Sequence, residues 1–281
     1  MHVAIDGDQM CYACGFATEG EELSHTLHNV KAAIERILKD TKSETYDLFI
    51  SGSSNYREDV AVSHEYKGTR TGKKPSSYED IREYLKGVWN AKESDGIESD
   101  DEVSLLLWED FIAACQQPED CKVILSSPDK DLNNTPGWHY NPRTQETYWV
   151  DERQATRHFC WQMLCGDGVD NIKGLPKLTI SGTSALGLKA GIGKKGVGKV
   201  TAKQITNVDM DAYQTIVNMF VAYLAWGFDE GLSEEQVEEY AREQYHLLWM
   251  LREREPSSSM WPCYEAGLVE AKTKFKESRY E

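Results

Sequence analysis

Acidic side chains occur in four separate segments of the 281-residue sequence, in positions where a folded sheet would bring them together. Carboxylates that converge raise each other's pKa unless cations neutralise them. Oxygen ligands without neighbouring His or Cys favour Mg²⁺ or Mn²⁺ over zinc. The four segments contain Asp6 and Asp8, residues 98–102, Asp129 and Asp131, and Asp167 and Asp170. Together they predict a site for divalent cations.

Two such ions about 4 Å apart form a site that cleaves phosphodiesters. One ion lowers the pKa of an attacking water, and both stabilise the charged oxygens during the displacement. Each segment alone has an ordinary structural explanation, because acids favour helix starts and Asp-Gly is a common turn. The metal site is favoured because all four segments lie beside a predicted strand or turn.

Alternating strands and helices are expected to position these segments. Residues 2–5, 47–51 and 121–127 are short apolar runs typical of buried strands, and residues 78–89 and 100–116 are predicted helices. This alternation predicts an α/β fold with a mainly parallel sheet. Three of the four acidic segments then fall at strand ends or in the following connections, where open α/β sheets form ligand sites.

The sequence changes character from about residue 151 onward. Residues 151–164 are predicted to be helical, and Ser233 to Gln236 match a capping box that starts another helix. Between them, residues 173–203 carry seven lysines and seven glycines and no acidic residue. Glycine permits close backbone approach to phosphate, and lysines supply positive charge. This segment is therefore the predicted contact with a polyanion.

Composition taken as a whole points away from such a partner. Lys and Arg number 31 against 47 Asp and Glu, so the formal charge is −16, which should repel nucleic acid. The distribution matters more than the total, because residues 173–203 alone carry +7. The seven cysteines, including a lone Cys11-x-x-Cys14 pair, predict buried thiols rather than a disulfide framework or a zinc site. Neither a signal peptide nor a membrane span is expected, so we predict a cytoplasmic protein.

The order of these motifs resembles the flap endonuclease and 5′→3′ exonuclease family, and most of all the exonucleases of short-tailed bacteriophages. Residues 65–70 (Glu-Tyr-Lys-Gly-Thr-Arg) are similar to the family's Tyr-Lys-x-x-Arg motif at the base of a helical arch. Residues 196–202 (Gly-Val-Gly-Lys-Val-Thr-Ala) are similar to its helix–hairpin–helix turn. The resemblance spans roughly residues 1–205.

The resemblance implies a PIN-like fold in two parts. Residues 1–165 would form the α/β nuclease core, with the arch near residues 66–95, and residues 166–281 would form a DNA-binding and helical region. The implied activity is divalent-metal-dependent hydrolysis of DNA, or of RNA:DNA hybrids, from 5′ ends or at flaps and gaps. Such a monomeric enzyme would serve phage-type replication, recombination or primer removal, in the host cytoplasm if it is phage-encoded.

The resemblance also implies roles for individual residues. A first Mg²⁺ or Mn²⁺ ion would be held by Asp6, Glu98, Asp100, Asp101 and Asp129. A second would be held by Asp131, Asp167 and Asp170, with Asp129 able to bridge. The scissile phosphate would be contacted by Lys67 and Arg70. The residues that would hold the duplex backbone are Lys194, Lys195, Gly196, Gly198, Lys199 and Lys203. A K⁺ ion would bind main-chain carbonyls of the same element.

Two departures from the family pattern stand out. Many relatives have an aspartate after the second strand, where this chain has Ser51-Gly52-Ser53. One ligand of the first ion is therefore missing or replaced by water. In addition, residues 177–195 separate the Asp167/Asp170 turn from the glycine hairpin, which relatives place close together.

Two other functions are compatible with parts of the pattern. Asp6-Gly7-Asp8 resembles the nucleophile motif of haloacid-dehalogenase-type phosphatases, and residues 166–170 are similar to the metal turn of those enzymes. That interpretation gives no role to residues 98–101, to Lys67 and Arg70, or to the lysine- and glycine-rich stretch. Alternatively, the Ser51 departure is compatible with a branched-DNA-binding protein that has lost catalysis.

Overall fold

The computed structural model describes residues 1–188 and 196–279, whose contacts form two compact units. The first unit comprises residues 1–56, 71–151 and 250–256. The second comprises residues 57–70, residues 152–249 and the chain from residue 257 onward. These units do not follow the single division near residue 165 that we predicted, because helix α6 (Glu152–Cys165) packs on helices of the second unit.

A six-stranded sheet in the order β3-β2-β1-β4-β5-β6 organises the first unit. Its strands are β1 (His2–Asp6), β2 (Thr45–Ile50), β3 (Lys92–Glu93), β4 (Val123–Ser126), β5 (Gly137–Asn141) and β6 (Glu146–Val150). Every pairing is parallel except that of β5 with β6. The predicted α/β fold with a mainly parallel sheet is confirmed, and β1, β2 and β4 match the three predicted strands.

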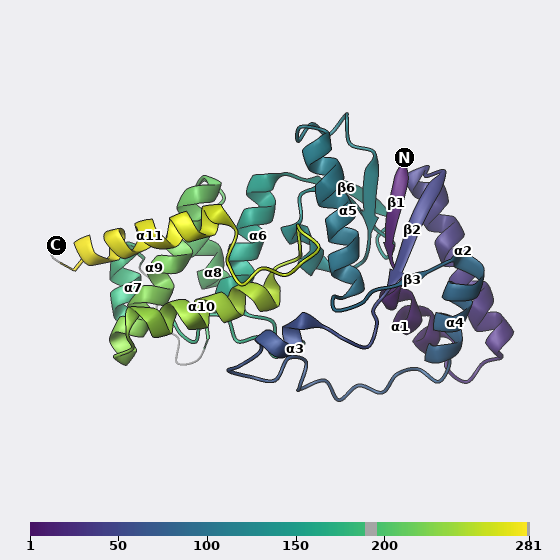
Figure 1. Ribbon diagram of the computed structural model, residues 1–281, viewed down its shortest axis with the longest axis horizontal. Coiled ribbons are helices and arrows are strands. Elements are labelled where there is room, and N and C mark those ends of the chain that lie inside the picture. Colours follow the sequence, from purple (N-terminus) through teal and green to yellow (C-terminus); the bar gives the residue numbers. More distant parts are fainter. Residues whose placement is uncertain (189–195, 280–281) are drawn as a thin grey trace. The chain divides into compact units, whose positions relative to one another are not determined.

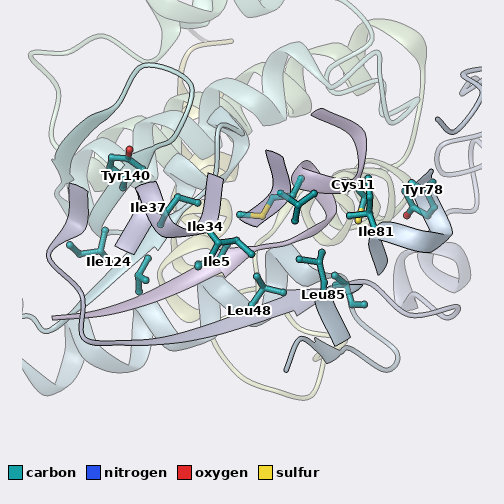
Figure 2. Packing of buried hydrophobic residues seen from close by; sticks show 14 residues of the cluster. Ile5, Cys11, Ile34, Ile37, Leu48, Tyr78, Ile81, Leu85, Ile124 and Tyr140 are labelled. Atoms are coloured by element: carbon teal, nitrogen blue, oxygen red, sulfur yellow. The ribbon is translucent and has the colours of Figure 1, made fainter. Parts of the chain in front are cut away.

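Helices cover both faces of this sheet (Figure 1). On one face lie α1 (Asp8–Ala17), α2 (Leu23–Thr41) and α4 (Tyr78–Trp89), and on the other lies α5 (Ser99–Ala113). Successive residues of a strand point to opposite faces. Ile5 therefore belongs to the cluster on one face that also contains Ile34 and Ile81 (Figure 2), whereas its neighbour Ala4 belongs to the cluster on the other face with Val103 of α5. A single-turn 3-10 helix, η1 (Lys130–Asn134), follows β4.

The second unit is helical and is built around α9 (Ala212–Glu230), most of which is buried. Its other helices are α6, α7 (Ile180–Ala185), α8 (Lys199–Ile205), α10 (Glu234–Leu248) and α11 (Pro262–Glu277), and all contact α9 (Figure 1). The capping box predicted at Ser233 starts α10. The short helix α3 (Tyr56–Val60) brings Arg57 into this unit, where the buried guanidinium donates to the carbonyls of Leu247 and Trp249. Across the described ranges of the chain, none of the helices has the length and apolarity needed to span a membrane.

Candidate functional site

Asp6 occupies the last position of β1, at the carboxyl edge of the parallel strands. Only 2% of the residue is exposed, and each carboxylate oxygen accepts a hydrogen bond from a serine. Ser99, the first residue of α5, donates to Oδ1 over 3.0 Å, and Ser127, just after β4, donates to Oδ2 over 3.0 Å. The Asp8 N–H also donates to Oδ1, over 3.2 Å, so three donors fix the orientation of the carboxylate and a lone pair on Oδ2 is left for a cation.

Burial is the main reason why the pKa of Asp6 is raised to about 7, and repulsion from Asp8 and Asp129 adds to it. The hydrogen bonds from Ser99 and Ser127 act in the opposite direction. A charged carboxylate is costly in this position, and neighbouring carboxylates increase the cost. A bound cation would remove the penalty, so the electrostatics of this edge favour one.

Gly7 allows the two aspartates around it to meet at this edge. Its N–H donates to the Phe49 carbonyl of β2 over 2.7 Å, and a Cβ at this position would lie 2.7 Å from that same oxygen. Any side chain here would push β1 away from β2. Glycine is therefore required here for the close approach to β2, and Asp8 starts α1 directly after it.

The acidic cluster at residues 98–102 has mainly structural contacts in the first unit. Glu98 and Asp101 form a reciprocal capping box at the start of α5. Asp101 is fully buried, and its second oxygen accepts the Leu251 N–H over 3.1 Å. Glu102 pairs with Arg254 at 3.1 Å. Asp101 is thus committed to backbone groups, whereas Glu98 and Asp100 are partly exposed.

The third predicted segment lies next to Asp6 in the sheet, because β4 pairs with β1. Asp129 is the N-cap of η1, and its Oδ1 accepts the Asp131 N–H over 2.9 Å. Its own N–H donates to the Ser127 hydroxyl that also contacts Asp6. Asp131 is partly exposed and lies 3.7 Å from the Lys130 ammonium. Asp6 and Asp129 therefore lie at the ends of adjacent parallel strands and share the Ser127 hydroxyl as a hydrogen-bond partner, and we predicted that these two segments would meet.

Among residues 1–188 and 196–279, no three His, Cys, Asp or Glu side chains are close enough together to hold a metal ion by themselves. A closed cage is not what Mg²⁺ requires, because this ion usually binds one or two carboxylates and keeps several waters. Asp6 and Asp129 are oxygen donors whose charges repel each other, and histidine or cysteine is not part of the set. Their chemistry therefore fits Mg²⁺ or Mn²⁺ with a largely aqueous shell.

The fourth acidic segment belongs to the second unit, where two glycines close the turn after α6. Gly166 and Gly174 have φ angles of +67° and +62°, and a Cβ on Gly174 would lie 2.8 Å from the Met163 carbonyl. Asp167 and Ile172 exchange backbone hydrogen bonds of 2.8 and 2.7 Å across the turn. The turn thus holds Asp167 and Asp170, both partly exposed, between two glycines with positive φ angles.

Asp170 is already paired in this turn. Arg70 forms an ion pair with its Oδ1, and the Tyr66 hydroxyl donates to its Oδ2 over 3.2 Å. The Lys67 N–H donates to the Asp170 carbonyl over 2.9 Å, and the Lys67 ammonium lies 4.9 Å from the Tyr66 ring centroid. The predicted phosphate-contacting residues Lys67 and Arg70 are therefore gathered around a predicted metal ligand, an arrangement that the sequence spacing did not reveal.

The segment predicted as a glycine hairpin precedes α8, and Gly198 is the N-cap of that helix. Gly196 bonds to the Pro176 carbonyl over 2.6 Å and has a φ angle of +66°. A Cβ on Gly196 or on Gly198 would meet nothing within 4 Å, so the backbone is open to approach. Lys199 and Lys203 are exposed on α8. Lys194 and Lys195 lie outside the described residues.

Sequence reasoning missed the polar groups that hold Asp6. Ser99 and Ser127 are nearly buried serines, and local spacing gives no signal for a hydroxyl that contacts a distant strand. It also left Asp8 without a role. The Asp8 carboxylate accepts the Ser51 N–H over 3.1 Å and lies 3.5 Å from the Arg82 guanidinium. Ser51 is thereby part of the same network.

Comparison with known proteins gives matches only among solved structures; no family model and no curated protein matches the chain. The bacteriophage T5 D15 protein co-crystallised with metal ions is 15% identical, with a TM-score of 0.47, over 88% of this chain and 98% of that one. A T5 D15 flap endonuclease variant in complex with DNA and metal ions is 14% identical, with a TM-score of 0.48 and the same coverage. A T5 5′-exonuclease mutant is 13% identical, with a TM-score of 0.47, over 88% and 99% of the two chains.

Proposed function

We propose that this chain is a divalent-metal-dependent nuclease that hydrolyses DNA from 5′ ends or at flaps. The observation that carries the proposal is Asp6, a buried carboxylate at the carboxyl edge of a parallel sheet whose two oxygens are oriented by Ser99 and Ser127. A buried, repelled and carefully oriented carboxylate is costly for stability and is the kind of group found at functional sites.

In this proposal Asp6 and Asp129 hold Mg²⁺ or Mn²⁺, with water completing the coordination. When bound, the ion lowers the pKa of an attacking water and stabilises the charged phosphate oxygens. Ser99 and Ser127 keep the Asp6 oxygens directed at the ion, because each hydroxyl occupies one lone pair on a different oxygen. Ligation by Glu98, Asp100, Asp101, Asp131, Asp167 and Asp170, and a second ion, stay predictions.

The second unit supplies the proposed contacts with the nucleic-acid backbone. Lys67 and Arg70 carry the positive charge suited to a phosphate, and the planar guanidinium can bind two oxygens at once. The open glycines Gly196 and Gly198 and the exposed lysines Lys199 and Lys203 favour sequence-independent contact with a duplex. This distribution offers a polyanion a basic surface in spite of the net charge of −16.

A cleavage assay tests the proposal directly. The substrates are 5′-labelled blunt duplex, 5′-flap DNA and an RNA:DNA hybrid, each with Mg²⁺, Mn²⁺ or EDTA, and product lengths are resolved. We expect metal-dependent products from the DNA substrates. Binding of the flap without turnover in either metal would instead favour the catalytically impaired protein. Hydrolysis of p-nitrophenyl phosphate that DNA does not inhibit would favour the phosphatase.

A further inference from the structure

Asp8 lies beside the proposed metal ligand Asp6, but its oxygens already face protein donors. Its two oxygens accept the Ser51 N–H over 3.2 and 3.1 Å, and Oδ2 also lies 3.2 Å from the Ser99 hydroxyl. Arg82 approaches Oδ1 at 3.5 Å. A carboxylate that accepts a backbone amide and faces a guanidinium has fewer lone pairs to offer a metal ion.

Arg82 is built into the unit as an internal cation. Only 12% of its side chain is exposed, and its Nη2 donates to the Ser51 carbonyl over 2.8 Å. The same guanidinium lies 3.5 Å from Glu93 of β3. A partly buried guanidinium with several fixed acceptors has little freedom to leave, so it stays beside Asp8 and offsets part of the charge of that carboxylate.

The Ser99 hydroxyl connects this pair to Asp6. It lies 3.0 Å from Asp6 Oδ1 and 3.2 Å from Asp8 Oδ2, but it carries a single hydrogen. While the Arg82 guanidinium lies beside Asp8, the Ser99 hydroxyl can donate its hydrogen to Asp6. Without Arg82, an uncompensated Asp8 would compete both for this hydrogen and for any nearby cation.

We propose that Arg82 is a positioning residue that keeps Asp8 out of the metal's coordination sphere and thereby fixes Asp6. The proposal rests on the proposed function, because it takes Asp6 as a metal ligand. It assigns the Asp8–Arg82 pair to the place where the family pattern has an aspartate and this chain has Ser51. A protein cation and a carboxylate together occupy that place, and the cation is shared with Glu93.

The test compares the variants Arg82→Met, Asp8→Asn and the double variant with the wild-type full chain. Mn²⁺ binding is measured by calorimetry without DNA, and single-turnover DNA cleavage is measured at saturating Mn²⁺. We expect Arg82→Met to bind Mn²⁺ about three- to tenfold more tightly, because a positive charge is lost. Its cleavage rate should fall about ten- to a hundredfold, because Asp6 is no longer held correctly.

Adding Asp8→Asn to Arg82→Met should restore the Mn²⁺ affinity to near the wild-type value and recover at least about tenfold in rate, because the competing carboxylate is gone. Arg82→Lys should retain part of the rate. Lys86→Met is the matched control, since Lys86 lies on the same helix and near the same Glu93, at 3.6 Å, and should change neither measurement.

Two results would overturn the proposal. Unchanged Mn²⁺ affinity in Arg82→Met without recovery in the double variant would mean that Arg82 only holds α4 in place. Loss of Mn²⁺ binding in Asp8→Asn alone would make Asp8 a ligand, and this variant keeps Arg82 and its contact with Ser51. If the wild-type chain binds Mn²⁺ but does not cleave DNA, the proposed function fails while the binding comparison still decides the role of Arg82.

Discussion

Asp6 and Asp170 carry the same functional group in opposite surroundings. Asp6 is buried at a strand end, and two serines orient it. Asp170 is held on an exposed glycine-closed turn, where Arg70 and Tyr66 compensate its charge. The ionised Asp6 carboxylate destabilises the folded state, whereas the Asp170 carboxylate is stabilised by its ion pair with Arg70. The difference shows two ways in which a fold holds a carboxylate: by orienting it in a buried position, or by pairing it with a cation.

The largest effect should come from removing the Asp6 charge. Asp6→Asn should abolish metal-dependent cleavage and at the same time stabilise the protein. Because burial raises the pKa of Asp6 to about 7, ionisation of this group makes the folded state less stable as the pH rises from about 4 to about 7. At pH 8 in EDTA we expect a gain of about 2 kcal/mol in the free energy of unfolding, measured by urea denaturation.

The matched variant Asp170→Asn should show no such gain, because Arg70 loses its partner when the carboxylate is removed. A stabilised Asp170→Asn variant, or an Asp6→Asn variant that is less stable than wild type at pH 8, would contradict the contrast between the two sites.

The next effect concerns the rigidity of the turn that holds Asp170. Gly174→Ala should cost about 3 kcal/mol, because it combines a positive φ with a clash against Gly166 and the Met163 carbonyl. Gly168→Ala lies in the same turn, where a Cβ meets nothing within 4 Å, and should change stability by less than about 0.5 kcal/mol. Thermal denaturation of both variants gives the comparison, and equal costs would mean that the glycine contact does not hold the turn.

Removing the hydroxyl that donates to each carboxylate should affect cleavage differently at the two sites. Ser127→Ala should raise the Mg²⁺ concentration for half-maximal cleavage, or lower the rate, by about ten- to a hundredfold. Tyr66→Phe removes the 3.2 Å hydrogen bond to Asp170 and should change either quantity by only about threefold or less, because Arg70 still holds the carboxylate. An equal response to Mg²⁺ titration in both variants would show that burial does not distinguish the sites.

Acidification should destabilise the sheet through His139 of β5. Burial lowers the pKa of this histidine to about 4, so the unfolded chain takes up a proton first as the pH falls below about 6.5. Between pH 7 and pH 5 the protein should lose about 2 kcal/mol from this group. The loss should be absent in His139→Gln and retained in the control His28→Gln, which changes an exposed residue of α2. Urea denaturation at several pH values makes the comparison.

The smallest effect should come from the exposed lysines of α8. Lys199→Ala and Lys203→Ala should weaken DNA binding uniformly across sequences, and each should lower the slope of log affinity against log salt by about 1. Lys39→Ala on α2 is the control for lost charge. Fluorescence anisotropy at several salt concentrations measures the slopes, and identical slopes for all variants would remove α8 from the interface.

The strands that position Asp6 and Asp129 could be predicted because buried parallel strands are short continuous apolar runs. The hairpin of β5 and β6 was missed, although Trp138 and Tyr140 of β5 alternate with the polar residues His139 and Asn141. Helix α11 was missed as well. Its buried Tyr264, Leu268, Ala271 and Phe275 follow helical spacing, and Pro262 stands at its start.

Of the candidate site, only Asp6 and Asp129 could be predicted from the sequence, because both are acidic residues at or just after the end of a strand. Contacts such as Ser127 with Asp6 join residues that are distant in sequence, and spacing contains no information about them. At residues 98–102 the local explanation has more support than we gave it, because the Glu98 and Asp101 side chains cap the helix reciprocally. Pairing of Asp170 with Arg70 depends on how the segment 57–70 joins the second unit, which a sequence pattern cannot express.

The chain passes between its two units five times, at residues 56/57, 70/71, 151/152, 249/250 and 256/257. The returning segment 250–256 completes the sheet-containing unit through the Leu251 bond to Asp101 and through Arg252, which lies 4.2 Å from the Trp108 ring centroid. A ribosome must therefore synthesise almost the entire chain before this unit has all its parts. No single proteolytic cut can release either unit whole, and fragments ending near residue 151 should need the missing peptides in trans to regain native stability.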